Sequence, residues 1–272
     1  MAFDLQTSFD YERPIQIGEG VYWIGFCDLL SGLHCNPYLV VDGDEAVVID
    51  GGSRPDFPTV MMKIMQTGTN PASINALIYQ HYDPDLCGSI PNFESIIDKG
   101  DDLKIISDRE NNIFIRHYLV TAPLLSLEKV NSEFIFSSGR KLKFIKTPYA
   151  HSPGSFVTFD EKSRVLFTSD LFGSYAKEWN LFLSLWPECR ECRDYSCCPS
   201  NKKYCPVKDI MKFHQKIMTS TKALRYALKQ LTDIPYETIA PQHGGVICNL
   251  NDIEFIQDTL AKLADVGIDG IL

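Results

Sequence analysis

The sequence predicts an α/β protein in which two β-sheets pack face to face between outer helices, a four-layer αβ/βα sandwich. Three observations lead to this fold class. Each half of the chain opens with segments of strand character and continues with short strands mixed with helices. Turn sequences rich in Gly, Asp and Ser separate the strands. The chain is also long and apolar enough for a sizeable core, with 272 residues of which 44% are hydrophobic.

The first half begins with strands. An apolar strand is predicted at residues 21–26, and residues 37–41 and 46–49 form a hairpin across the turn Asp42-Gly43-Asp44. The hairpin ends in Asp50-Gly51-Gly52, where glycine provides the backbone freedom for an exit from the strand. The remaining elements are a helix, two strands and a second helix, at residues 57–67, 76–78, 103–106 and 110–118.

The second half starts again with hairpins. Residues 133–136 pair with 141–145, and residues 156–159 pair with 165–168, because each pair flanks a turn sequence. Amphipathic spacing then predicts a long helix at residues 209–231 and a closing helix at residues 253–263. A short strand is predicted between them, at residues 238–240. We expect one domain over residues 1–272, with a cysteine-rich insertion at about 186–206.

The composition argues against several classes of partner. Lys and Arg number 26 and Asp and Glu number 35, so the net charge is −9. This acidity disfavours nucleic acid and anionic membranes, because phosphate binding needs a basic face. No apolar run approaches the ~20 residues of a membrane-spanning helix, and residues 1–14 contain three acidic side chains, unlike a secretory signal. We expect a soluble, cytoplasmic protein.

The nine cysteines fall into two sets. Four are scattered along the chain: Cys27, Cys35, Cys87 and Cys248. Five are crowded in the predicted insertion: Cys189, Cys192, Cys197, Cys198 and Cys205. An odd number of cysteines without an export signal argues against a disulfide framework. Crowding at C-x-x-C spacing indicates metal or redox chemistry instead.

The crowded set could bind a structural zinc ion or an iron–sulfur cluster. Cys205-Pro206 is similar to the Cys-Pro ending of some ferredoxin runs, and either Cys197 or Cys198 would be the third of four ligands. We favour the iron–sulfur cluster. The alternative is a group of reduced thiols in a surface insertion.

Histidines and aspartates gather where predicted strands end. His117 and His214 lie inside predicted helices, where a surface or hydrogen-bonded core histidine is the default. In His81-Tyr82-Asp83-Pro84-Asp85, alternating side chains can converge on a metal ion, although Asp85 could instead cap the next helix. His151, Asp170 and His243 each follow a strand. Three histidines and three aspartates at strand ends together indicate a metal site.

These motifs carry a family resemblance. The residues 81–85 and 50–52, His151, residues 168–173 (TSDLFG) and residues 241–244 (PQHG) resemble the metallo-β-lactamase superfamily. Within it, the chain is most similar to the diiron domain of flavodiiron proteins and to the oxygen-binding diiron proteins of bacterial chemotaxis systems.

The resemblance implies two iron ions and a set of ligands. His81, Asp83 and His151 would hold one iron, Asp85 and His243 the other, and Asp170 would bridge both. The chain departs from the family at two positions: Asp83 is often Glu, and Leu86 stands where a second-iron histidine is usual. We expect that iron to keep an open coordination position. His34 is a possible substitute ligand, but the simpler expectation is that His34 lines the pocket together with Leu86 and Tyr149. Alternatively, Leu86 only packs against the helix that starts nearby.

The ligand set also bears on the choice of metal. Zinc hydrolases of this fold usually present HxHxDH, whereas Asp83 occupies the middle position here. A harder oxygen ligand favours iron over zinc. A zinc hydrolase is therefore the second alternative.

The resemblance further implies a function. Flavodiiron enzymes continue into a flavodoxin-like domain, but this chain ends 272 − 243 = 29 residues beyond His243, so we expect no flavin. Without a nearby electron source, binding dioxygen is favoured over its reduction. We expect an oxygen sensor, responsive also to iron, that reports to a chemoreceptor or chemotaxis signalling protein rather than an enzyme. If the protein is an enzyme, we expect an O2 or NO reductase with a separate redox donor. The sequence leaves the oligomeric state open, and a homo-oligomer is possible.

Overall fold

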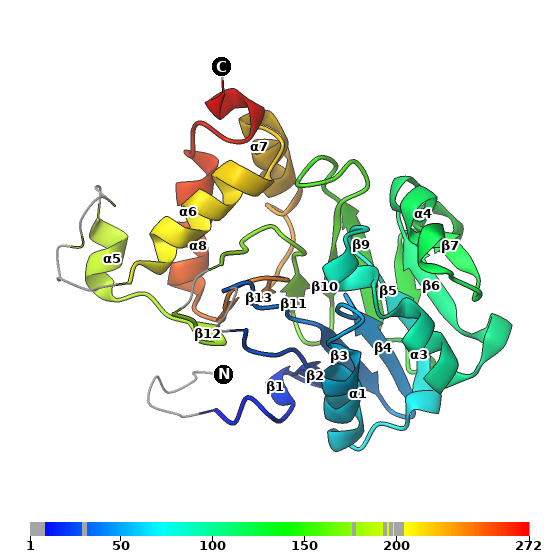
Figure 1. The fold of residues 1–272 in the computed structure, drawn as a ribbon. Coiled ribbons are helices and arrows are strands. Elements are labelled where there is room, and N and C mark those ends of the chain that lie inside the picture. Colours follow the sequence, from blue (N-terminus) through cyan, green and yellow to red (C-terminus); the bar gives the residue numbers. More distant parts are fainter. Residues whose placement is uncertain are drawn as a thin grey trace.

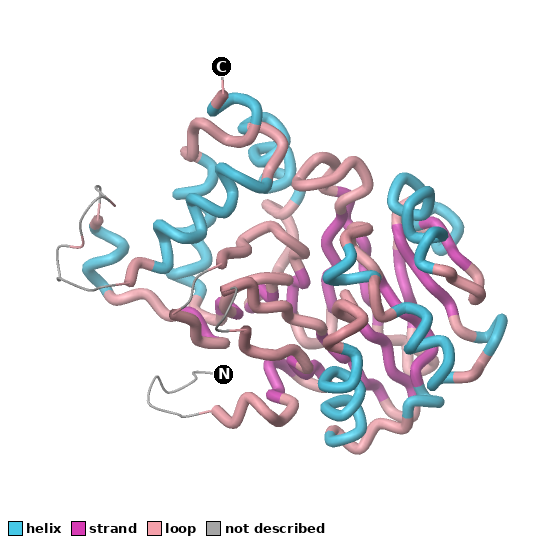
Figure 2. Tube along the Cα trace, in the orientation of Figure 1, coloured by secondary structure: helices cyan, strands magenta, loops and turns pink. Residues whose placement is uncertain are grey.

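Two β-sheets form the centre of the molecule, and helices lie on the outer face of each (Figure 1). The structure is a computed structural model that describes residues 9–28, 32–175, 178–192, 195, 198 and 204–271. Figure 2 shows the strands running through the middle of the molecule with helices on either side. The predicted four-layer α/β sandwich is confirmed. None of the helices in the described ranges has the length and apolar content needed to cross a membrane.

The first sheet keeps the strands in chain order. Its members are β1 Ile15–Gly18, β2 Val21–Trp23, β3 Tyr38–Asp42, β4 Glu45–Ile49, β5 Ile74–Ile78, β6 Lys104–Ser107 and β7 Leu124–Ser126. Strands β1 to β4 are antiparallel, and β4 to β7 are parallel. Parallel neighbours need a crossover, and the crossover helices α1 Phe57–Gln66, α3 Ile90–Ile97 and α4 Arg109–Ile115 cover the outer face.

The second sheet mixes both directions. From edge to edge, its members are β12 Phe182–Leu183, β14 Val246–Ile247, β13 Thr238–Ala240, β11 Val165–Phe167, β10 Phe156–Asp160, β9 Lys141–Lys146 and β8 Glu133–Ile135. Strand β11 runs parallel to β13 and antiparallel to β10. The outer face is covered by α6 Pro206–Ile217, α7 Thr221–Gln230 and α8 Leu250–Ala261.

Shorter helical elements connect these layers. Helix α2 covers Pro84–Cys87 and α5 covers Pro187–Glu191. Single 3₁₀ turns lie at Pro71–Ser73, Gly100–Asp102, Arg116–Tyr118, Leu127–Val130 and Ile268–Gly270.

One predicted helix is wrong. We predicted a continuous helix over residues 209–231, but the structure has α6 and α7 with a break at Met218–Ser220. Ser220 is extended, and its side chain accepts a hydrogen bond from the Ala223 amide, so it caps α7. The C-terminal segment occupies the break, where the Gly267 amide donates to the Gln215 carbonyl at 2.8 Å. A tertiary contact and a local cap together override the amphipathic spacing.

The two sheets are joined closely at one end of the sandwich. The Asn36 side chain donates to the carbonyls of Pro241 and Gly244 at 2.9 and 2.8 Å, and the Tyr38 hydroxyl donates to Pro241 at 2.8 Å. On the other side, the Phe156 amide donates to the Gln80 carbonyl at 3.3 Å. These bonds hold the loops after β5 and β13 against the opposite sheet, so the carboxyl ends of strands from both sheets meet there.

Candidate metal centre

A short loop after β5 presents three ligand-type side chains. His81 leaves the strand, Asp83 is the N-cap residue of α2, and Pro84 at the first helical position suits a helix start. The Asp83 carboxylate accepts no hydrogen bond from the helix, so its oxygens remain available. Asp85 lies in the first turn of α2. The alternative in which Asp85 caps this helix is therefore wrong.

His81, Asp83 and His151 form a first group of three donors. Each residue has one ligand atom within 4.8 Å of the others. His151 Nε2 lies 2.9 Å from Asp83 Oδ2, and His81 Nε2 lies 3.8 Å from the same oxygen. The His81 ring is fixed by a 2.7 Å hydrogen bond between its Nδ1 and Ser169 Oγ. This arrangement leaves Nε2 of His81 directed toward the group.

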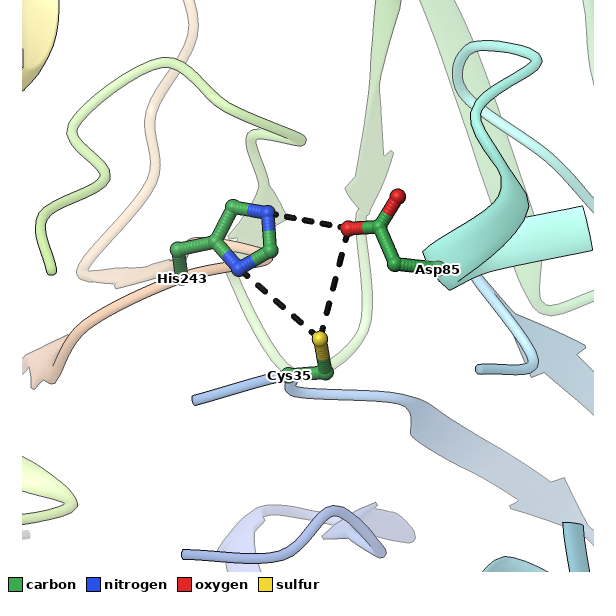
Figure 3. Close-up of side chains that lie close together, drawn as sticks. All are labelled: Cys35, Asp85 and His243. Carbon is green, nitrogen blue, oxygen red and sulfur yellow. Dashed lines mark hydrogen bonds and ion pairs between the residues drawn. The ribbon is translucent and has the colours of Figure 1, made fainter. Parts of the chain in front are cut away.

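Cys35, Asp85 and His243 form a second group with the same spacing (Figure 3). His243 Nε2 lies 3.2 Å from Asp85 Oδ2, and the Cys35 sulfur lies 4.0 Å from both Asp85 Oδ2 and His243 Nδ1. His243 Nδ1 donates to the main-chain carbonyl of His34 at 3.0 Å. With the ring held in this way, Nε2 faces the carboxylates.

Asp170 lies between the two groups. Its Oδ1 is 3.7 Å from His243 Nε2, and its Oδ2 is 3.8 Å from His151 Nδ1. Oδ1 is buried and has no hydrogen-bond partner. A buried carboxylate oxygen without a partner is costly. This oxygen has the position and the chemistry to accept a cation.

The charges in the centre shift each other's protonation. Burial disfavours the charge on His151, but the hydrogen bond to Asp83 and the charge of Asp170 outweigh it and raise the pKa of His151 to about 9. Burial likewise works against ionisation of Asp85, but His243 more than compensates and lowers the pKa of Asp85 to about 2. Without a metal ion, protonated imidazole rings thus balance the carboxylates.

Asp170 and the members of the two groups other than Cys35 line one cavity of about 520 Å³. Its lining combines the predicted metal ligands with an apolar wall and one lysine: His81, Asp83, Asp85, His151, Asp170 and His243, with Leu33, Pro84, Tyr175, Phe213, Ile217 and Lys216. The six residues selected from the sequence are therefore brought together. Their role as ligands remains a prediction.

Three other predicted pocket residues lie elsewhere. The His34 ring stacks on Trp179 at 4.5 Å and its Nδ1 accepts a hydrogen bond from the Asp28 amide, while its carbonyl accepts from His243 Nδ1. Leu86 is fully buried in the apolar layer between the first sheet and its helices, and Tyr149 is 55% exposed. Neither of these two lines the cavity.

Cys35 is the residue that sequence reasoning missed. It forms an isolated antiparallel β-bridge with His243, 208 residues away in sequence. Its neighbour His34 was considered, but Cys35 was counted among the scattered cysteines. A pairing over such a separation leaves no local pattern in the sequence.

His214 is a core histidine, as expected for a histidine inside a helix. Its Nδ1 donates to the Ile210 carbonyl at 2.7 Å, and its Nε2 accepts from the Phe172 amide at 2.9 Å. Burial lowers its pKa to about 4, so the ring is neutral. The hydrogen bond from the Phe172 amide to His214 holds the loop that carries Asp170. His117, by contrast, is exposed.

The crowded cysteines lie around α5 and the start of α6. Cys189, Cys192, Cys198 and Cys205 are half-buried, and Cys197 lies outside the described residues. Burial raises the pKa values of Cys189 and Cys205, and the neighbouring thiols add to this effect. The described cysteines form no disulfide. Within the described part of the chain, these thiols do not meet the 4.8 Å spacing of the two groups above, so a metal site here stays a prediction.

Comparison with known proteins gives consistent matches. The model of a family described as ODP family beta lactamase matches residues 33–244. The putative diflavin flavoprotein A 1 of Nostoc sp. is 22% identical over 222 residues, which cover 80% of this chain and 34% of that protein. The chain thus spans about a third of the length of this curated relative.

Solved structures share the fold. The rubredoxin oxygen:oxidoreductase of Desulfovibrio gigas superimposes with a TM-score of 0.76 at 18% identity, covering 92% of this chain and 61% of that one. A structure titled as a peroxy diiron species of chemotaxis sensor ODP has a TM-score of 0.72, and the apo state of chemotaxis sensor ODP from T. denticola has 0.70. Both structures are 21% identical to this chain, and each match covers 95% of this chain. The matches cover 97% of the peroxy diiron structure's chain and 96% of the apo structure's chain.

The ion pairs predict how the stability of the metal-free protein depends on pH. The pKa of His151 is raised from 6.5 to about 9, so its stabilising contribution is complete below pH 6.5 and is lost as the pH rises toward 9. The pKa of Asp85 is lowered from 3.8 to about 2, so its contribution is complete above pH 3.8 and is lost toward pH 2. Urea unfolding of chelator-treated protein should show the His151 contribution being lost between about pH 6.5 and 9 and the Asp85 contribution being lost from about pH 4 toward pH 2.

His151→Gln should flatten the alkaline limb of this profile, and the exposed control His117→Gln should leave it unchanged. Wild-type stability that stays constant from pH 6.5 to 9 would contradict the ion-pair assignment.

Proposed function

Because the chain belongs to the ODP family of beta-lactamase-type proteins, we propose that it holds two iron ions and binds dioxygen with them. His81, Asp83 and His151 hold one ion, and Asp85 and His243 hold the other. Asp170 is the bridging ligand. The observation that supports this proposal best is the position of Asp170, whose two oxygens face one histidine of each group while Oδ1 is buried without a partner.

The donor set fits iron. Imidazole nitrogens and carboxylate oxygens are ligands that iron accepts in non-haem sites. The His81 and His243 rings are oriented by bonds from their other nitrogen, to Ser169 Oγ and the His34 carbonyl, as metal-ligating histidines usually are. The carboxylates of Asp83, Asp85 and Asp170 supply the negative charge that two cations require.

A pair of ferrous ions would supply the electrons and coordination positions for binding dioxygen. The chain supplies the surroundings. Leu33, Phe213 and Ile217 give the cavity an apolar wall that suits a small apolar molecule and limits water around the carboxylates. Lys216 lies on the same lining, with its Nζ 5.6 Å from the centroid of the Tyr175 ring. It is the cationic side chain of that wall.

We further propose that the protein acts as a cytoplasmic oxygen sensor, responsive also to iron, whose partner is a chemoreceptor or another chemotaxis signalling protein. The matched structures titled chemotaxis sensor ODP support this, since the match covers nearly their whole length. The second candidate is an O2 or NO reductase with a separate redox donor, which the oxidoreductase from D. gigas favours. A zinc hydrolase is third, because Asp83 provides an oxygen donor where such enzymes use histidine.

Removal of the bridging carboxylate should empty the paired site. In the Cys189→Ser, Cys192→Ser background, where the cysteine-rich segment should hold no iron, we expect Asp170→Ala, expressed and purified anaerobically, to fall from two irons per chain to less than one, because two neighbouring cations would lose the charge between them. His117→Ala, at an exposed position, should keep both. Metal analysis by mass spectrometry measures the outcome. Two irons per chain in Asp170→Ala would overturn the ligand assignment.

The response to air separates the three candidate functions. A sensor, once reduced, should develop a visible absorption band that persists for minutes in air. A reductase should lose this band rapidly and consume oxygen when a reducing protein such as rubredoxin is added. Protein that retains zinc and shows no band, but cleaves ester or lactam substrates, would establish the hydrolase and reject the iron proposal.

The cysteine-rich segment is proposed as a second metal site, with an iron–sulfur cluster favoured over zinc. The crowding of Cys189, Cys192, Cys198 and Cys205 along the sequence supports it. We expect acid-labile sulfide and more than two irons per chain in the intact protein. The double variant Cys189→Ser, Cys192→Ser should lose the sulfide and the iron in excess of two. If zinc replaces sulfide, the site is structural. If the intact protein has neither, the segment is a set of thiols.

A further inference from the structure

The second group contains a thiol, and the resemblance leaves the ion of this same group short of one donor. Leu86, which stands where a histidine is usual, is buried in the core between the first sheet and its helices. Cys35 comes from the other side of the centre, before β3, and its sulfur lies 4.0 Å from Asp85 Oδ2 (Figure 3). The chain therefore offers sulfur in place of the missing nitrogen.

The Cys35 backbone is fixed from both sides. The Phe26 amide donates to its carbonyl, and the next amide, that of Asn36, donates to the Gln242 carbonyl at 2.9 Å. Its β-bridge to His243 sets the two residues side by side. Gly25 packs so closely that a Cβ there would lie 2.3 Å from the Cys35 carbonyl oxygen. The thiol is thus held in the centre by structure, and it is only 4% exposed.

Two separations in this group, both measured to Asp85 Oδ2, suit an ion bound to the Asp85 carboxylate. Metal bonds of about 2.3 Å to sulfur and about 2.1 Å to oxygen or nitrogen bridge separations of up to about 4.4 Å. The sulfur lies 4.0 Å from the carboxylate oxygen, and His243 Nε2 lies 3.2 Å from that same oxygen. An independent sign of a ligand is the buried, unpartnered Oδ1 of Asp170, which is 3.7 Å from His243 Nε2.

We propose that Cys35 supplies a thiolate ligand to the ion held by Asp85, His243 and Asp170. This inference rests on the proposed function, since a metal has to occupy the centre. As the sulfur–metal bond forms, the S–H bond breaks and its proton leaves to solvent, with no transfer of electrons. The two ions then differ in kind: the first has only nitrogen and oxygen donors, and the second has one sulfur donor, which pushes electron density onto the metal.

Cobalt(II) titration of the metal-free protein tests the proposal, because a thiolate bound to cobalt gives an intense near-ultraviolet charge-transfer band. The cysteine-rich segment could give the same band, so the parent protein is a variant in which all five of its cysteines are replaced by serine: Cys189, Cys192, Cys197, Cys198 and Cys205. We expect this parent to bind two cobalt ions with the band. Adding Cys35→Ser should abolish the band and lower the cobalt affinity of the second group at least tenfold, while the affinity of the first group stays unchanged. Adding Cys248→Ser, which replaces a half-buried thiol outside both groups, should change neither.

The outcomes separate the two proposals. Two cobalt ions in the parent without a Cys35-dependent band would overturn the thiolate ligand and leave the paired site standing. Failure of the parent to bind two ions would instead overturn the proposed function. Circular dichroism and thermal unfolding of the metal-free proteins check that Cys35→Ser is folded. If it is not, the presence or absence of the sulfur band in the parent, compared with its Cys248→Ser variant, still decides.

Discussion

The structure of the centre depends on one constraint: several carboxylates share a buried end of the sandwich, and their mutual repulsion has to be compensated. Asp83, Asp85 and Asp170 face the cavity, and Asp50 lies beneath them. Burial, with smaller contributions from the charges of Asp170 and Asp85, raises the pKa of Asp50 to about 7 even though two hydrogen bonds from Gln80 oppose the shift. The raised pKa of Asp50 shows mainly how strongly burial disfavours a charge at this end of the sandwich, and the neighbouring carboxylates add to that cost.

Backbone strain accompanies this crowding. Asp50, His151, Ser169 and Phe172 all have positive φ, at 54°, 91°, 53° and 66°. Side chains other than glycine reach this region at a cost of about 1–3 kcal/mol each, so the surrounding bonds have to enforce it. Bonds at these residues do so: the Asp50 amide donates to the Ile78 carbonyl, the Ser169 carbonyl accepts from the Gln242 amide, and the Phe172 amide donates to His214 Nε2. Strain of this kind clusters where function requires a fixed geometry.

The sequence predicted the parts of this arrangement that have a local cause. The hairpin that ends at Ile49 follows from its turn, and His81 and Asp170 follow from strand ends. Strands β12 and β14, with two residues each, are too short to show a pattern, and they exist because they pair with each other across the chain. Cys35 is hidden for the same reason, since its bridge to His243 spans most of the sequence.

Exposure makes the two groups unequal. In the first, the side chains of Asp83 and His151 are 34% and 23% exposed. In the second, Asp85 is 27% exposed, but His243 and Cys35 are only 5% and 4% exposed. Ligands that reach solvent are protonated and replaced by water more readily than buried ones, so an ion in the first group would exchange more easily. Occupancy of the pair would then follow the iron supply through the first group, while the buried group keeps its ion. Under the proposed function, a centre that has to hold both ions to bind dioxygen would thereby depend on two quantities, iron and oxygen.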